Sequence, residues 1–212
     1  MHTLRLFAIS IDAVRDIFGA DPALAERLRA VAAARFAPPT RARPSGILGL
    51  FRRDRQLEVD PSRPLVSDVE ALLAGGYISP DRTRQCWLVL LAWLEELSTA
   101  HAELAVRELD TLEFDLARAG LHSDNSLRNL AARQLGTILR PLPGQTVGYA
   151  KHSTAVDTLD ALVSLGRTAD EEFAAVIART DPVRDLLTVV ATGQDLDVVV
   201  VEVPPGETTP GR

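Results

Sequence analysis

Residues 79–120 read SPDRTRQCWLVLLAWLEELSTAHAELAVRELDTLEFDLARAG. Neither glycine nor proline interrupts this stretch between Pro80 and Gly120, and every residue from Cys86 to Leu94 is apolar. A helix that is apolar all round must be buried on most of its sides. The apolar run is much too short for a membrane span, which takes about 20 residues. We therefore expect Cys86 to Leu94 to form the dry centre of the fold.

The two ends of this stretch carry helix signals. Ser79 suits an N-cap position and Pro80 suits the first helical position, while Gly120 is a typical stop. Beyond Leu94 the pattern becomes amphipathic, which is compatible with one long helix or with two helices joined near residues 98–100. Two antiparallel helices bury more surface in a small domain, which favours the second arrangement. The apolar stripe of the second half is predicted to comprise Leu97, Leu104, Leu109, Leu112 and Leu116.

Both ends of the chain predict strands. Leu4 to Ile9 alternates in the manner of a strand, and Val198 to Val203 is an unbroken VVVVEV run. Such a run is typical of a strand that is covered on both faces. An alternative is that Leu187 to Ala191 is also a strand and forms a hairpin with the valine run. We expect a small sheet made from the N- and C-terminal strands.

Capping patterns predict several further helices. The expected starts are Asp21-Pro22, the Ser67–Glu70 capping box, the polar run 122–126 before an inward-facing Leu127 to Leu139 helix, Ser153 before a helix that ends at Gly166, and Thr180-Asp181-Pro182. Residues 147–149 are expected to be extended. The predicted fold class is α+β and predominantly α-helical, with helices packed round a central apolar helix and a small terminal sheet.

Composition is consistent with a single globular domain over residues 1–203, followed by a flexible tail at 204–212. The chain has 212 residues, of which 46% are hydrophobic and 25% charged. The lone Cys86 excludes an internal disulfide and suits a reducing compartment. No signal-peptide pattern opens the sequence, so we expect a cytoplasmic protein.

Charge is unevenly distributed along the chain. The net charge of −6 argues against general nucleic-acid affinity. Five arginines and one aspartate between residues 41 and 55 give a local charge of +4, which leaves −10 for the other 197 residues. The carboxylate pairs, Glu95/Glu96 among them, are expected to lie on solvated helix faces.

The basic segment belongs to a long loop rich in proline and arginine at residues 38–64. Long loops without secondary structure tend to be functional or disordered. Arginines flank the apolar patch GILGLF at 46–51, so the loop could dock on an acidic partner or an anionic lipid surface. Alternatively the apolar residues fold back on the domain. The candidate binding residues are Arg41, Arg43, Phe51, Arg52, Arg53 and Arg55.

Known catalytic and cofactor motifs are missing from the sequence. The four histidines are scattered and no HExxH occurs, so no metal site is predicted. There is no phosphate-binding glycine loop and no nucleophile motif, and Cys86 is expected to be a buried thiol with a raised pKa. We expect no cofactor, and a non-enzymatic role is favoured while catalysis stays open. A ligand site assembled in three dimensions would draw on His122, Asp124, Asn125, Lys151 and His152.

Three features resemble small bacterial proteins of families known only as domains of unknown function, some of them immunity-protein-like. The features are the opening strand and capped helix (4–19), the helix-Gly-Gly step (72–77) and the closing helix-Gly-strand (182–203). The resemblance implies a binding role and carries no catalytic residues.

Three hypotheses of function follow. The first is a non-enzymatic, immunity-like protein-binding module whose acidic surface engages a basic partner by charge complementarity. The second is an enzyme or small-ligand-binding protein that uses the five polar residues named above. The third is a peripheral membrane or scaffold role through the 46–53 loop, although a membrane role is less expected. The sequence leaves the oligomeric state open.

Overall fold

The structure is a computed structural model that describes residues 3–37, 62–136 and 138–203. The described residues form four strands, eight α-helices and several short 3-10 helices. In chain order these are β1 (Thr3–Ile9), α1 (Ile11–Asp16), α2 (Pro22–Phe36), α3 (Val66–Leu73), η2 (Pro80–Arg82), α4 (Thr83–Leu97), β2 (Ala100–Ala105), α5 (Val106–Arg118), η3 (Ser123–Asn125), η4 (Leu127–Ala131), β3 (Val147–Ala150), α6 (His152–Thr168), η5 (Glu171–Phe173), α7 (Ala174–Ala178), α8 (Asp181–Thr192) and β4 (Asp197–Val203).

The strands form one antiparallel sheet in the order β2-β1-β4-β3. The predicted pairing of the two chain ends is confirmed, because Thr3 lies opposite Val203 and Ile9 lies opposite Asp197. The expected extended piece near residue 147 is β3, which pairs with β4 at one edge. The possible hairpin partner at 187–191 is instead part of helix α8.

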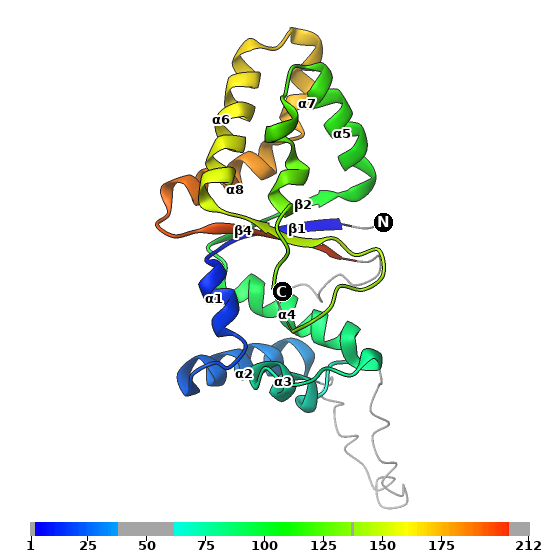
Figure 1. Ribbon diagram of the computed structural model, residues 1–212, viewed down its shortest axis with the longest axis vertical. Coiled ribbons are helices and arrows are strands. Elements are labelled where there is room, and N and C mark those ends of the chain that lie inside the picture. Colours follow the sequence, from blue (N-terminus) through cyan, green and yellow to red (C-terminus); the bar gives the residue numbers. More distant parts are fainter. Residues whose placement is uncertain (1–2, 38–61, 137, 204–212) are drawn as a thin grey trace, which may run out of the picture.

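Helices cover both faces of the sheet, as Figure 1 shows. One face carries Leu6 and Val200, which pack in a core with residues of α5, α6, α7 and α8. The other face carries Phe7 and Val199, which pack with residues of α1, α2, α3 and α4. All seven residues of β4 are buried, so the prediction that this strand is covered on both faces is confirmed. The fold is α+β and mostly helical, as the sequence predicts.

Helix α4 is largely buried, as its apolar sequence predicts. Trp87 and Trp93 are 1% and 0% exposed, and their indole N–H groups donate to the carbonyl oxygens of Arg140 and Leu28 at 3.1 and 2.8 Å. This helix is the centre of one core only. The helices α5 to α8 pack on the opposite face of the sheet, so the sheet rather than α4 lies at the middle of the molecule (Figure 1).

The stretch 79–120 contains two helices, with a strand between them that the helical pattern had concealed. After α4 ends at Leu97, the chain runs through β2 before α5 begins at Val106. Leu104, which was expected on a helical stripe, lies on β2 opposite Leu4. Along β2 the residues Ala102 and Leu104 are buried while His101 and Glu103 are exposed, which is the alternation of a strand with one covered face.

The expected helix from Leu127 to Leu139 is replaced by the short 3-10 helix η4 and irregular chain. Leu130 belongs to the core on one face of the sheet and Leu139 to the core on the other. The segment therefore passes from one face to the other, which a single helix packed on one face cannot do. On the way, Arg133 forms a β-bridge with Tyr149 at the outer side of β3.

The buried position of Cys86 gives a chemical test of the α4 core. Burial, reinforced by the negative charge of Asp68, raises the pKa of the Cys86 thiol to about 12. At pH 8 only about one thiol in ten thousand would then be ionised, and the thiolate is the reactive form. We predict that a chromogenic disulfide reagent leaves the native protein unmodified at pH 8 and titrates one thiol in guanidinium chloride. Equal rates in both conditions would contradict the buried position.

Candidate functional site

The first predicted site cannot be placed. Residues 38–61, which include Arg41, Arg43, Phe51, Arg52, Arg53 and Arg55, lie outside the described residues. The binding role of that loop stays a prediction. Within the described chain, no helix combines the length and apolarity that crossing a membrane requires.

The second predicted site falls into two separate polar groups. His122, Asp124 and Asn125 lie at η3, where the ring nitrogen Nδ1 of His122 accepts a hydrogen bond from the backbone N–H of Asp124 at 3.3 Å. The side chains of His122 and Asp124 are 72% and 85% exposed. This is the capping role that the polar run predicts, in a short 3-10 helix.

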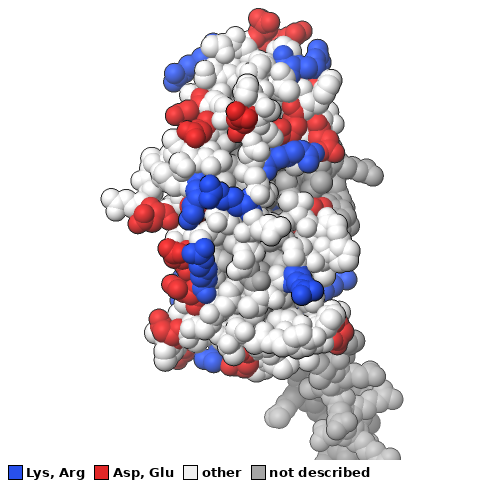
Figure 2. All heavy atoms as spheres, in the orientation of Figure 1, with Lys and Arg blue, Asp and Glu red and all other residues white. Residues whose placement is uncertain are grey.

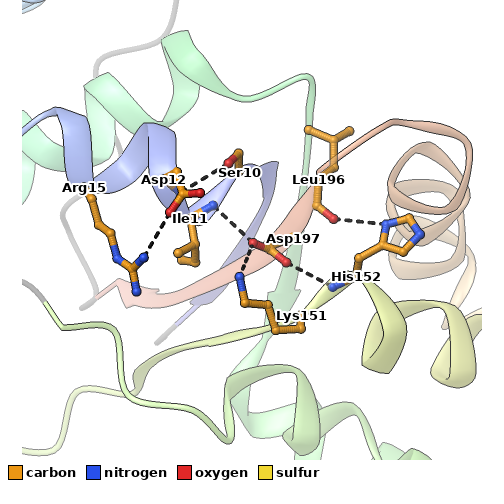
Figure 3. A network of polar contacts seen from close by, with 8 residues as sticks. All are labelled: Ser10, Ile11, Asp12, Arg15, Lys151, His152, Leu196 and Asp197. Atoms are coloured by element: carbon orange, nitrogen blue, oxygen red, sulfur yellow. Dashed lines mark hydrogen bonds and ion pairs between the residues drawn. The ribbon is translucent and has the colours of Figure 1, made fainter.

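The other two residues of that prediction, Lys151 and His152, lie at the start of α6. Lys151 Nζ and the backbone N–H of His152 meet Asp197, while the His152 ring is directed at Leu196 (Figure 3). Between this pair and the group at η3, no hydrogen bond or ion pair occurs in the described residues. The structure does not join the five residues into one polar site.

Asp197 is the centre of the network in Figure 3, and sequence reasoning did not single it out. Its buried carboxylate accepts from the backbone N–H of Ile11 at 3.2 Å, from that of His152 at 3.0 Å and from Lys151 Nζ at 3.1 Å. Asp197 thereby binds the starts of α1 and α6 with one side chain, where the helix dipoles favour a negative charge, and at α1 it acts beside the N-cap Ser10.

Two details of this network correct and complete the sequence analysis. Helix α6 begins at His152 and not after Ser153, because the cap is supplied by the distant Asp197. His152 Nδ1 lies 3.2 Å from the carbonyl oxygen of Leu196, and since a carbonyl only accepts, Nδ1 carries the hydrogen. The Asp197 carboxylate is occupied by the protein's own donors, so the network holds β4 and two helix starts together and offers no general base.

A second cluster of charges connects helices α2 and α4 to strand β1. Glu95 accepts hydrogen bonds from Arg5 at 2.5 Å and from Arg35, and its side chain is only 20% exposed. Arg5 also pairs with Glu103 at 2.8 Å. Glu95 was expected on a solvated helix face; the arginines from β1 and α2 enclose it instead. Its chemistry is that of a satisfied structural ion pair.

The outer edge of β2 borders a shallow groove of about 460 Å³. Because β2 is the last strand of the sheet, only one of its sides pairs with a neighbouring strand of the described chain. The apolar floor of the groove comes from Ala102 on β2 and from Leu186 and Val189 on α8, and Glu103 and Asp185 add carboxylates. The alternation of small apolar and polar residues in AHAELA is the one sequence signal that could have indicated this strand, and sequence reasoning missed it.

A deeper cavity of about 320 Å³ lies between the sheet and α5, η4 and α8. Its apolar lining includes Leu4, Leu6, Leu104, Leu109, Val183 and Val200, which come from five elements. Asp110, Arg128 and Thr146 supply the polar part of the lining, and Arg128 forms an ion pair with Asp110. No sequence pattern marks this cavity, because its walls meet only in the folded chain.

Figure 2 shows acidic and basic side chains interspersed on one face of the molecule. Exposed ion pairs also occur among the described residues, for example Arg29 with Glu70 at 2.7 Å, where the contact raises the pKa of Arg29 and lowers that of Glu70. The described residues contain no cluster of three or more side chains suited to hold a metal ion.

Comparison with known proteins adds no relative: no family model matches the chain, and no curated protein or solved structure is significantly similar to it. The function must therefore be argued from the geometry of this chain alone.

Replacing Asp197 by Asn tests the network that holds the two helix starts. The amide loses the charge that Lys151 contacts and offers a donor where the carboxylate accepted, so we predict a loss of about 1–3 kcal/mol in the free energy of unfolding. Urea unfolding measures it. The control is Asp195→Asn: Asp195 is exposed, at a φ of 61° that Asn also tolerates, and should change stability by less than about 0.5 kcal/mol. Equal effects of the two substitutions would contradict the assigned role.

Proposed function

We propose that the protein is a non-enzymatic binding module that takes an extended, positively charged segment of a partner protein onto the free edge of β2. The observation that carries the proposal is this strand edge, which pairs with no strand of the described chain and lies beside a groove that holds the Asp185 carboxylate. The addition of a strand to an exposed sheet edge is a common mode of peptide recognition, in which main-chain hydrogen bonds provide much of the affinity.

The two edges of the sheet differ in a way that favours β2. At the β3 edge, Arg133 already exchanges two backbone hydrogen bonds with Tyr149, at 2.9 and 3.3 Å. No segment of the described chain covers the outer edge of β2 in this manner. Native proteins commonly protect an exposed edge, so an uncovered one is a natural place for a partner strand.

The charge around β2 sets the chemistry of the partner. Residues 152–196, which include α6, α7 and α8, contain eight carboxylates and three arginines, so this segment has a net charge of −5. Asp185 in the groove has no ion-pair partner among the described residues, whereas Glu103, on the strand itself, already pairs with Arg5. A basic segment would gain on-rate and specificity from this field.

The resemblance to immunity-like bacterial proteins suggests a toxin-neutralising version of this function, with a basic toxin as partner and the cytoplasm as its place. A peripheral membrane role through residues 46–53 stays a separate hypothesis, which flotation of a loop-deleted variant with liposomes would test.

The test is a nuclear magnetic resonance titration of the isotope-labelled protein with a capped peptide of alternating lysine and valine. We predict saturable shifts of the amides from His101 to Leu104, binding that weakens as salt is added, and no binding of a peptide whose backbone is N-methylated at every second residue. Asp185→Lys should weaken binding about tenfold by replacing attraction with repulsion.

The matched control is Asp157→Lys, at an exposed carboxylate of α6 without an ion-pair partner in the described chain. It changes the net charge by the same amount as Asp185→Lys, at a residue that does not line the groove. If both substitutions weaken binding to the same extent, or if the shifts fall outside β2, the edge is not the binding site.

A further inference from the structure

We propose that the cavity between the sheet and α5, η4 and α8 binds a small uncharged amphiphile: an apolar body of up to about a dozen heavy atoms with an alcohol or primary amide end. This site shares no lining residue with the groove beside β2, so it is independent of the proposed strand addition.

The inner wall of the cavity fixes the apolar part of the ligand. Leu4, Leu104 and Leu109 are 8%, 8% and 6% exposed, so they retain accessible surface although they belong to the core. They come from β1, β2 and α5, so they are held by both the sheet and the helical layer that covers it. An aliphatic or aromatic body would meet carbon atoms on all of these sides, the usual composition of a small-molecule pocket.

The volume fixes the size of the ligand. A well-studied engineered protein cavity of about 150 Å³, lined by similar side chains, holds one benzene molecule with its six heavy atoms. The cavity here has about 320 Å³, roughly twice as much. Molecules the size of an eight-carbon chain with a small polar end fit this space, whereas a long-chain lipid does not.

The exposed rim of the cavity determines which polar end group the ligand can carry. Asp110 and Arg128 line the cavity with side chains that are 75% and 59% exposed, so they lie at its solvent end and form an ion pair there. A carboxylate that bonds to Arg128 would take this partner away from Asp110, and an ammonium group that bonds to Asp110 would take it away from Arg128, so a charged end group must compete with the existing pair. An amide or hydroxyl both donates and accepts hydrogen bonds, so it can bond to the carboxylate and the guanidinium together without breaking the pair.

The test uses three probes with one chain length, octanamide, octanoate and octylammonium, in calorimetric titrations of the full chain. We predict saturable binding of octanamide with one site per chain and a negative heat-capacity change, and about tenfold weaker binding of both charged probes. Leu109→Phe and Leu127→Phe, which place a larger ring in the cavity wall, should weaken octanamide binding at least about tenfold.

Substitutions at the exposed rim decide the question without disturbing the core. Asp110→Asn should improve octanoate relative to octanamide about tenfold, and Arg128→Gln should do the same for octylammonium. Asp157→Asn, on α6, is the matched control and should leave both ratios unchanged. The proposal is overturned if no probe binds saturably, if the rim substitutions leave the ratios as they are in the unmodified protein, or if Asp157→Asn changes them equally.

Discussion

The pairing of the first strand with the last is the constraint on which the rest of the structure depends. Along β1 and β4 the apolar side chains point alternately to the two faces, and all of β4 is buried, so neither face can be left to water. Helices must therefore cover both faces, and the chain between residues 10 and 196 supplies one layer for each. Asp197, at the start of β4, fastens one helix from each layer to this pair.

Sequence reasoning found the features that are encoded locally. The valine run at 198–203, the segment 86–94, which is buried except for the half-buried Leu88, and the Asp21 cap are all read from neighbouring residues, and the structure contains each of them. It did not find β2, because the alternation in AHAELA is short and lies inside a stretch without helix breakers. It also placed the α6 cap at Ser153, because the actual cap, Asp197, lies far away along the chain.

The candidate sites were beyond prediction for the same reason. The wall of the cavity joins residues near 5, 105, 128, 183 and 200, and the groove joins β2 to α8; both exist only after the sheet has formed. The polar residues that sequence reasoning did select, His122 and Lys151 among them, serve as helix-start contacts. Polar residues at helix starts commonly serve as caps, and a sequence alone does not separate that use from ligand binding.

Native-state hydrogen exchange tests the central claim most directly, because it ranks the stability of each element inside one molecule. If the β1–β4 pair is the element on which both layers depend, the amides of Phe7, Val199 and Val201, which face the partner strand within this pair, will exchange only through global unfolding. Their free energy of opening will then equal that of the whole protein and will be no lower than that of α4. Exchange of these strand amides through a smaller opening, while the amides from Trp87 to Leu94 remain protected, would contradict the account.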